Sequence, residues 1–395
     1  MRQYEDYFSE ESIIELLCRY RVREADRRHK VVMAHKVTSH PIVRKKLERA
    51  KKPSKLDELL PPRSEWIRPR KQKRDECDPK KITRLALKAR IYAVRRLALA
   101  GRADIPVWYW RLREFIHTAQ LRALAPSKSE GFTRPIIYGE AKPTRSQAER
   151  RRRKKRGEKL QPFKRELRPI ADYILEDKVI ITLTARYLST IFDCEFCDSS
   201  YAFRKKRNAS GQVRSHHDAI VRILEFREQH ANEQIWVAEC DIKKFFDCID
   251  HEIVRECMRT LERSSGIVPD NRAMILFERY LSSYSFGTSV LPLNSDAEFQ
   301  EKMPGQFPWP EQDLMKRYGV EDISTLSIGI PQGGALSCFI ANLVMHSADL
   351  SQELFASKDF LYLRFCDDMV LLATRKAICE EGYGAYCKSA DELGF

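Results

Sequence analysis

The chain has 395 residues and a formal net charge of +15, with 71 Lys and Arg against 56 Asp and Glu. This length predicts two domains, or one large domain with an extension, and a hydrophobic content of 43% suffices for a core. The basic surplus predicts a polyanionic partner, either nucleic acid or an acidic membrane surface. No run of about 18 apolar residues occurs, which excludes a spanning helix, and the first residues lack an apolar signal core. We therefore expect a cytoplasmic protein without a membrane partner.

Residues 1–162 are predicted to form a basic, mostly helical N-terminal extension. Residues 9–20 begin like a capped amphipathic helix. Residues 80–100 repeat apolar side chains at three- and four-residue steps, and residues 108–124 follow the same pattern. Residues 150–156 are seven consecutive basic residues. A solvated charge run is one interpretation, whereas the overall charge favours an arm that binds nucleic-acid phosphates.

Eleven cysteines are scattered through apolar segments, a pattern typical of reduced and mostly buried thiols. Cys194 and Cys197 have the two-residue gap of a zinc half-site, but no second pair follows at a suitable spacing. We therefore expect these two cysteines to be structural thiols.

From residue 163 onward, short strand patterns alternate with longer helical ones. Residues 235–242 have the composition of a buried strand, and residues 251–261 have that of a helix. Residues 291–326 are rich in Pro, Asp and Gly, which predicts a long loop inserted between two motifs.

Residues 361–373 predict a hairpin, because two short apolar runs flank Asp367 and Asp368. Two adjacent carboxylates repel one another and raise each other's pKa unless a cation binds them. Ligands that are all oxygen suit Mg²⁺, with Mn²⁺ as the alternative. An isolated Asp pair is more often only part of a turn, so the function of this pair depends on the rest of the chain.

Asp241 falls at the end of the strand predicted over residues 235–242, where a carboxylate can point out of a sheet. A helix cap is the alternative role for this residue. Three carboxylates on two strand ends would form a two-metal clamp, which activates an attacking hydroxyl and stabilises a leaving pyrophosphate. Further along, Gly333 and Gly334 allow a close approach of the backbone to a ligand, and a helix is predicted to begin near Ala335.

Together these segments resemble the reverse transcriptase family, and in particular the bacterial enzymes of the group II intron-like, retron and phage-defence kinds. The match consists of a strand-end Asp followed by Phe-Phe-Asp, then Pro-Gln-Gly, then an Asp doublet in a hairpin. Further blocks resemble the fingers motifs of these enzymes: Arg168-Pro-Ile, Asp177-Lys178, Phe192-Asp193 and Ser200-Tyr-Ala-Phe-Arg204. The resemblance covers residues 163–395 and implies an α+β right-hand polymerase, with fingers and a palm made of an antiparallel sheet and packed helices.

The resemblance also implies catalytic roles. Asp241, Asp367 and Asp368 match the catalytic carboxylates and the ligands of two Mg²⁺ ions, and the backbone carbonyl of Ile242 would complete one coordination shell. Phe246 matches the steric gate, whose ring excludes a ribonucleotide 2′-hydroxyl. Packing in the core is the alternative role of Phe246.

Further residues match substrate contacts of the family. Gln332 matches the residue that lies against the sugar and base of the incoming nucleotide, with Gly333 next to it in the same turn. Arg168 matches a triphosphate-binding arginine, and Lys164 is a second candidate at a shorter spacing. Arg204 is either a contact to the template backbone or a member of a structural ion pair.

The chain departs from the family pattern in three places. Phe365-Cys366 replaces the usual Tyr-Ala before the doublet, which would alter the fit at the primer end. Cys338 stands where a proline is usual. The chain stops at residue 395, before the lysine, primer grip and thumb of the family, and Lys376 and Lys388 look like surface helix residues rather than substitutes. We expect either a truncated sequence or a partner that supplies these parts.

These features predict an RNA-directed DNA polymerase that adds deoxynucleotides to a primer 3′-hydroxyl by a two-metal mechanism, in bacterial antiphage defence. The implied partners are an RNA template, a DNA or RNA primer, deoxynucleoside triphosphates, and a non-coding RNA or protein that supplies thumb-like contacts. The alternatives are a truncated group II intron-type enzyme and a non-catalytic scaffold that binds nucleic acid with a polymerase fold. Synthesis without an external template, or priming from a protein hydroxyl, stays open.

Overall fold

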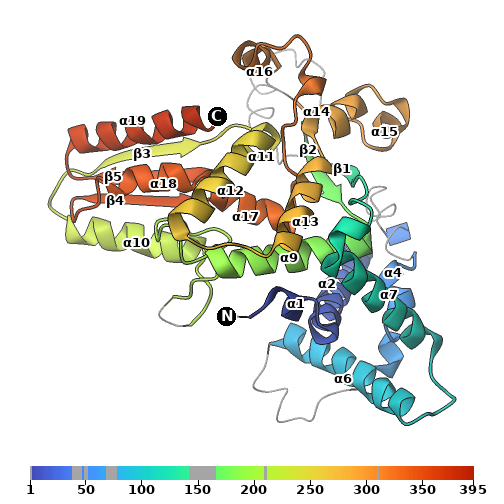
Figure 1. Cartoon of the computed structure of the whole chain (residues 1–395). Coiled ribbons are helices and arrows are strands. Elements are labelled where there is room, and N and C mark those ends of the chain that lie inside the picture. The colour runs from blue at the N-terminus through green and yellow to red at the C-terminus, as the bar shows by residue number, and fades with distance from the viewer. Residues whose placement is uncertain are drawn as a thin grey trace. The chain divides into compact units, whose positions relative to one another are not determined.

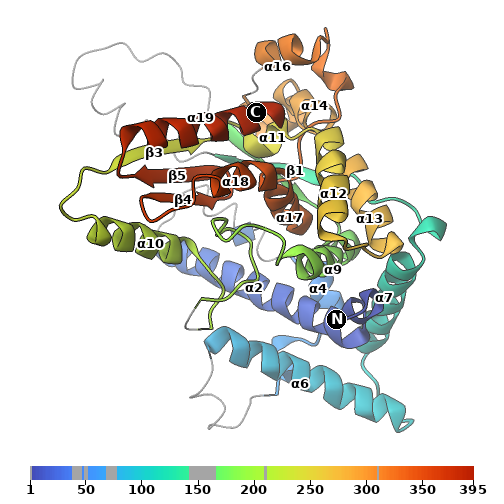
Figure 2. The same ribbon diagram turned by 60° about the vertical axis from the view of Figure 1, so that its left-hand side comes forward.

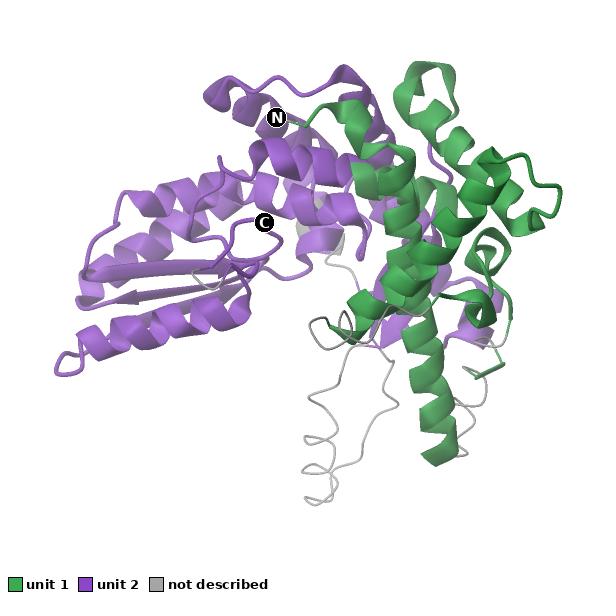
Figure 3. Cartoon of the chain, turned by 90° about the horizontal axis from the view of Figure 1, so that it is seen from below, with its two compact units in different colours: residues 1–130, 175–183 green, residues 131–174, 184–395 purple. Residues whose placement is uncertain are grey.

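The computed structural model describes residues 2–37, 47–48, 52–67, 78–141, 166–208, 211–308 and 311–395. The chain divides into two compact units, which are coloured separately in Figure 3. Unit 1 comprises residues 1–130 and 175–183, and unit 2 comprises residues 131–174 and 184–395. The change of unit after residue 130 lies upstream of the domain boundary predicted at residue 163, because a strand near residue 140 pairs with one near residue 170.

Unit 1 consists of helices (Figure 1). They are α1 (Tyr4–Tyr7), α2 (Glu10–Val37), α4 (Lys55–Leu59), η1 (Arg63–Glu65), α6 (Pro79–Leu99), α7 (Val107–Leu124) and η2 (Pro126–Lys128). The helices predicted from the apolar periodicity are confirmed as α2, α6 and α7. At the start of α2, Ser9 Oγ accepts the N–H of Ser12 at 3.3 Å, as the predicted cap requires.

A buried ion pair lies in unit 1. Asp177, which the sequence matches to a fingers motif, is fully buried and accepts a hydrogen bond from Arg122 Nη2 at 2.6 Å. Removing either partner of such a pair would leave an uncompensated buried charge. Loss of Arg122 alone would therefore destabilise this unit, because Asp177 would stay buried without this ion pair.

Unit 2 contains two antiparallel sheets and most of the remaining helices (Figures 1 and 2). The strands are β1 (Ile136–Ala141), β2 (Leu167–Asp172), β3 (Trp236–Asp241), β4 (Phe360–Phe365) and β5 (Asp368–Ala373). The helices are α9 (Leu175–Phe192), which begins in unit 1, α10 (His216–Gln229), α11 (Phe245–Cys248), α12 (His251–Ser265), α13 (Asn271–Ser282), α14 (Phe286–Ser289), α17 (Ala335–Val344), α18 (His346–Glu353) and α19 (Lys376–Glu392). The strand predicted over residues 235–242, the hairpin over 361–373 and the helix starts near residues 251 and 335 are all confirmed.

The three-stranded sheet has the order β3-β5-β4 and two unlike faces. Residues paired across antiparallel strands share a face, so Tyr362 and Arg364 of β4 lie on one face with Met369 of β5. This face is buried: the Tyr362 ring lies 6.2 Å from that of Tyr386 in α19, and its hydroxyl donates to Asp349 in α18. The opposite face is open to solvent along β3, where every second residue is exposed. An antiparallel sheet can leave one face to water, and here that face carries the acidic residues.

Residues 291–326 were predicted to form a long loop, and this prediction was wrong. The segment folds into η3 (Leu291–Asn294), α15 (Ala297–Lys302), α16 (Glu311–Tyr318) and η4 (Ile323–Thr325). Aspartates that look like loop residues in the sequence cap these helices instead: Asp296 accepts the N–H of Phe299 at 2.7 Å, and Asp322 accepts that of Ser324 at 2.8 Å. Phe307 is fully buried in a cluster with Leu167 and other apolar side chains.

The cysteines in the described part of the chain are all free thiols, as expected from their spacing. Cys197 is half-buried, and its Sγ lies 3.9 Å from His346 Nδ1, while burial raises the pKa of this thiol to about 12. Cys194 is exposed. Among the described residues, no helix is long and apolar enough to cross a membrane.

Gly329 offers a test of the packing around Phe286 and Asp247. Its φ is +88°, and an added Cβ would lie 2.8 Å from Phe286 Cβ and 3.1 Å from Asp247 O. We expect Gly329→Ala to lower the free energy of unfolding by about 2–4 kcal/mol, through left-handed backbone strain and overpacking. Urea-induced unfolding of the full chain measures the change.

Gly211→Ala is the matched control, because Gly211 has a φ of +76° with nothing within 4 Å of an added Cβ. Gly211→Ala should lower the free energy of unfolding by only about 1–2 kcal/mol, because it introduces backbone strain without a steric clash. Equal losses in the two variants would contradict the packing argument.

Candidate active site

The pairing of β3 with β5 brings the predicted carboxylates together. Asp241, the last residue of β3, is the direct cross-strand partner of Asp368, the first residue of β5. Directly opposed residues on one face have their Cβ atoms about 5 Å apart. Asp367 is joined to the same strand end, because its carbonyl oxygen lies 3.5 Å from the backbone nitrogen of Ile242. Residues more than 120 positions apart therefore meet at one edge of the sheet.

The electrostatics of this edge agree with its geometry. Burial, followed by the charges of Asp367 and Asp241, raises the pKa of Asp368 above its ordinary value of 3.8. Repulsion between carboxylates at this distance is the physical reason why such a cluster attracts a cation. Asp241 is not the cap of the helix that follows it, because the N-cap of α11 is Lys244. The cap of the next long helix, α12, is Asp250, which accepts the N–H of Glu252 at 2.7 Å.

The carboxylates of Asp241, Asp367 and Asp368 are suitable ligands for a divalent cation, although they do not form a complete coordination shell. Among the described residues, no group of three or more His, Cys, Asp or Glu side chains is arranged to hold a metal ion as it stands. Mg²⁺ in polymerase sites is typically held by one or two carboxylates together with waters and substrate phosphates rather than by protein alone. The backbone carbonyl of Ile242, the other predicted ligand, accepts the N–H of Phe245 at 3.3 Å and, like every carbonyl oxygen, has a second lone pair.

The hairpin turn is a strained part of this site. Cys366 is buried and has a φ of +65°, a conformation that favours glycine. Asp367 is the second residue of the turn and is half-buried. Phe365 is 36% exposed, and its ring lies 5.9 Å from that of His216.

Phe246 lies next to the strand end and is only half-buried, whereas Phe245 is 1% exposed. The two adjacent rings thus differ in burial, and the steric-gate role of Phe246 stays a prediction. Two hydrogen bonds between backbone groups fix the chain around Phe246. Ile330 N–H donates to Phe246 O at 2.8 Å, and Gly329 N–H donates to Ile249 O at 2.7 Å.

Gln332 is held by a buried carboxylate. Its Nε2 donates to Asp247 Oδ1 at 2.8 Å, and Asp247 is 2% exposed. Lys244, which has a φ of +61°, approaches Asp247 Oδ2 at 4.0 Å. Asp247 therefore links Gln332 to the short helix that carries Phe246.

The two glycines after Gln332 serve different purposes. Gly333 is exposed with a φ of +89°, so the turn requires its conformational freedom. Gly334 instead leaves space for Tyr280, because an added Cβ would overlap the hydroxyl oxygen of that side chain. The space that a side chain would occupy is thus nearly open at Gly333 and filled by Tyr280 at Gly334, and the approach of a ligand to this turn stays a prediction.

The predicted triphosphate contacts lie on and before β2. Arg168 is exposed on β2, and this strand is tied to the Pro-Gln-Gly loop because Ala171 N–H donates to Gln332 O at 3.3 Å. Lys164 lies outside the described residues, as does the basic run at residues 150–156.

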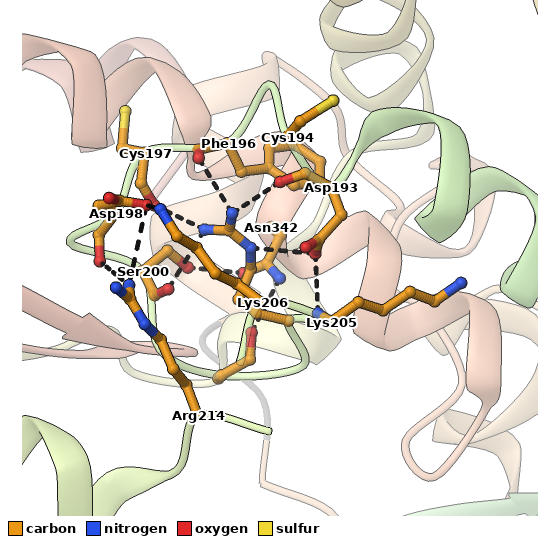
Figure 4. A network of polar contacts seen from close by, with 12 residues as sticks. Asp193, Cys194, Phe196, Cys197, Asp198, Ser200, Lys205, Lys206, Arg214 and Asn342 are labelled. Carbon is orange, nitrogen blue, oxygen red and sulfur yellow. Dashed lines mark hydrogen bonds and ion pairs between the residues drawn. The ribbon is translucent and has the colours of Figure 1, made fainter. Parts of the chain in front are cut away.

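The sequence left two roles open for Arg204, a contact to the template backbone and a structural ion pair. The structure shows the ion pair. Arg204 is 4% exposed, and its Nε donates to Asp193 Oδ1 at 3.1 Å. Its two terminal nitrogens donate to the backbone carbonyls of Asp193, Phe196, Cys197 and Ser200, residues that Figure 4 shows gathered around one guanidinium. A buried guanidinium with these partners is not available to a template.

Three polar residues at the site had no role predicted from the sequence, although Asp247 belongs to the Phe-Phe-Asp block of the family pattern. Asp247 fixes Gln332, and Arg364 with Asp349 forms a fully buried ion pair behind the hairpin, at 2.6 Å. The signal for Arg364 was present in the sequence, since an arginine inside an apolar strand must be paired when it is buried. Its partner could not be found, because Asp349 comes from a helix outside the hairpin.

A comparison with known protein families identifies the family of this chain. A family model described as reverse transcriptase (RNA-dependent DNA polymerase) matches residues 153–395, which is more than half of the chain. The chain therefore belongs to the reverse transcriptase family, and the predicted α+β polymerase fold is confirmed. No curated protein matches the chain.

Among solved structures, the chain is similar to telomerase from Candida albicans in complex with a TWJ fragment of telomeric RNA. The identity is 15% and the TM-score is 0.33, over 73% of this chain and 45% of the telomerase chain. The chain thus spans less than half the length of that telomerase chain.

The raised pKa of Asp368 predicts a pH-dependent effect on stability. Because the folded-state pKa lies above the ordinary 3.8, the contribution of Asp368 is complete below pH 3.8 and is lost as the pH rises through the folded-state pKa. Without metal at pH 7, Asp368→Asn should therefore raise the melting temperature, and the difference should shrink toward pH 4. Thermal unfolding in a chelating buffer at both pH values measures this.

Glu381→Gln removes the same charge from an exposed position of α19 and serves as the control. It should show no such pH-dependent gain. An Asp368→Asn protein that melts below the wild type at pH 7 would refute the repulsion.

Proposed function

We propose that this protein is an RNA-directed DNA polymerase that extends a primer 3′-hydroxyl with deoxynucleotides. The observation that carries the proposal is the cross-strand pairing of Asp241 with Asp368, next to Asp367, on the open face of the three-stranded sheet. Membership of the reverse transcriptase family supports the same reaction. Phosphoryl transfer depends on positioning and charge neutralisation, and a carboxylate cluster on a rigid strand end supplies both when cations are bound.

In this proposal the residues of the chain bind and orient the substrates. Asp241, Asp367 and Asp368 would hold two Mg²⁺ ions, which would activate the primer hydroxyl and stabilise the leaving pyrophosphate. Gln332, fixed by its bond to Asp247, would lie against the sugar and base of the nucleotide. Arg168, exposed on β2, would bind the triphosphate through charge-assisted hydrogen bonds.

The template and primer would be held mainly through their phosphates. A net charge of +15 favours such contacts, which weaken as salt rises. Partners that supply thumb-like contacts, a bacterial origin, a cytoplasmic location and a role in antiphage defence stay predictions from the sequence.

A non-catalytic scaffold is the second candidate function. A basic protein of this fold would bind nucleic acid by charge whether or not its carboxylates are intact. The like charges at Asp241, Asp367 and Asp368 argue against it, because their repulsion is a cost that a scaffold would have no reason to keep.

The carboxylate role is tested at Asp367. We expect Asp367→Ala to reduce Mg²⁺-dependent incorporation of deoxynucleotides on a primed RNA template by about 10³-fold or more, as for other residues that act as one catalytic unit. Incorporation by the purified full chain into a labelled primer measures it.

Glu381→Gln, on the exposed surface of α19, controls for the change in charge and should incorporate as the wild type does. Binding of the primed template, measured separately, should survive in Asp367→Ala. Equal incorporation by wild type and Asp367→Ala would instead support the scaffold.

The steric gate is tested at Phe246. Replacing the half-buried ring with Ala should lower the preference for deoxynucleotides over ribonucleotides by about 10- to 100-fold, because the space for a 2′-hydroxyl is no longer filled. The ratio of kcat/KM for the two nucleotides measures the preference. An unchanged ratio together with a lower melting temperature would assign Phe246 to core packing.

A further inference from the structure

A fully buried arginine lies directly behind the carboxylate hairpin. Arg364 is 1% exposed and occupies β4, three residues before Asp367. Arginine is almost never fully buried unless it is paired, and burying a charge carries a large desolvation cost. The substrate contacts assigned above leave Arg364 without a role, although it is the largest fully buried side chain among the described residues.

The ion pair with α18 fixes the plane of this guanidinium. Nε and Nη2 of Arg364 donate to Oδ1 and Oδ2 of Asp349 at 2.7 and 2.6 Å. Asp349 is itself fully buried, and it also accepts the hydroxyl of Tyr362 at 2.8 Å. A two-bond pair between planar groups leaves little rotational freedom.

The third side of the guanidinium is directed at the turn. Arg364 Nη1 donates to the carbonyl oxygen of Cys366 at 2.8 Å. This carbonyl belongs to the same planar peptide as the nitrogen of Asp367, so the bond constrains the backbone that carries the first carboxylate. Cys366 has a φ of +65°, a strained conformation that persists only where surrounding contacts enforce it.

Two further segments complete the surroundings of Arg364. Nη2 lies 3.0 Å from Ser200 Oγ and 3.4 Å from Asn342 Oδ1, and both of these residues, visible in Figure 4, are buried. The backbone of Arg364 is held as well, because its N–H donates to Ser199 O at 2.8 Å and its carbonyl accepts from Tyr201 N–H at 2.9 Å. The guanidinium therefore connects the turn to α17, α18 and the segment before α10.

We propose that Arg364, oriented by Asp349, is a positioning residue that holds the Cys366–Asp367 turn so that Asp367 and Asp368 face Asp241. The inference rests on the proposed polymerase function. Arg364 acts through the turn and touches no substrate. Residues that orient metal-binding groups in this way typically change metal affinity or activity by about 10- to 100-fold when they are replaced.

Arg364→Lys tests this role, because lysine keeps the charge near Asp349 but lacks the planar fork that reaches both the carboxylate and the turn. We expect the Mg²⁺ concentration for half-maximal synthesis to rise by about 10- to 100-fold. We also expect faster alkylation of the Cys366 thiol, followed by peptide mass spectrometry. Asp349→Asn, a milder change that keeps the shape of the partner, should move both measurements in the same direction by less.

Arg204→Lys is the matched control. It removes the fork of another buried arginine in unit 2, which donates to Asp193 and to the backbone carbonyls of residues 193, 196, 197 and 200 rather than to the hairpin. This variant should lower the melting temperature while leaving the Mg²⁺ requirement and the alkylation of Cys366 at wild-type values. The Mg²⁺ requirement does not depend on the fraction of active protein, so it separates positioning from loss of folded enzyme.

An unchanged Mg²⁺ requirement and unchanged Cys366 alkylation in both Arg364→Lys and Asp349→Asn would overturn the positioning role. The positioning role would also be overturned if the lower melting temperature of the variants fully explained their loss of synthesis. A wild type without Asp367-dependent synthesis would count against the proposed function itself. Alkylation of Cys366 would even then decide whether Arg364 holds the turn.

Discussion

The antiparallel pairing of β3 with β5 is the interaction on which the rest of the candidate site depends. It sets Asp241 opposite Asp368 and so forces two like charges together at a strand end. Repulsion of this kind disfavours the folded chain unless something offsets it. Here the buried face of the sheet offsets it, because Tyr362 and its neighbours pack under α18 and α19, while the acidic face stays open.

Around this sheet, polar residues with almost no exposure fix the residues proposed to meet the substrate. Asp247 holds Gln332, and the Asp349–Arg364 pair holds the carbonyl of Cys366. The buried charge of Arg364 is satisfied by several hydrogen bonds, as a low-dielectric interior requires. These contacts explain how the hairpin can keep a left-handed cysteine beside its carboxylates.

Much of the local structure could be predicted from the sequence. The strand ending at Asp241, the hairpin around Asp367 and the helix starting at Ala335 follow from apolar runs bounded by turn residues. Residues 291–326 were mistaken for a loop, because aspartates that cap short helices resemble loop residues in composition. Periodicity over six to eight residues is too short to separate these cases.

The sequence by itself determined the family pattern and the three acidic residues, because residue types and their order along the chain carry that information. The tertiary structure alone decided which residues meet. It paired Asp241 with Asp368, buried Arg204 among backbone carbonyls, and placed Asp349 against Arg364. Such contacts join segments far apart in the chain, and they depend on sheet register and helix packing. No local sequence pattern encodes either one.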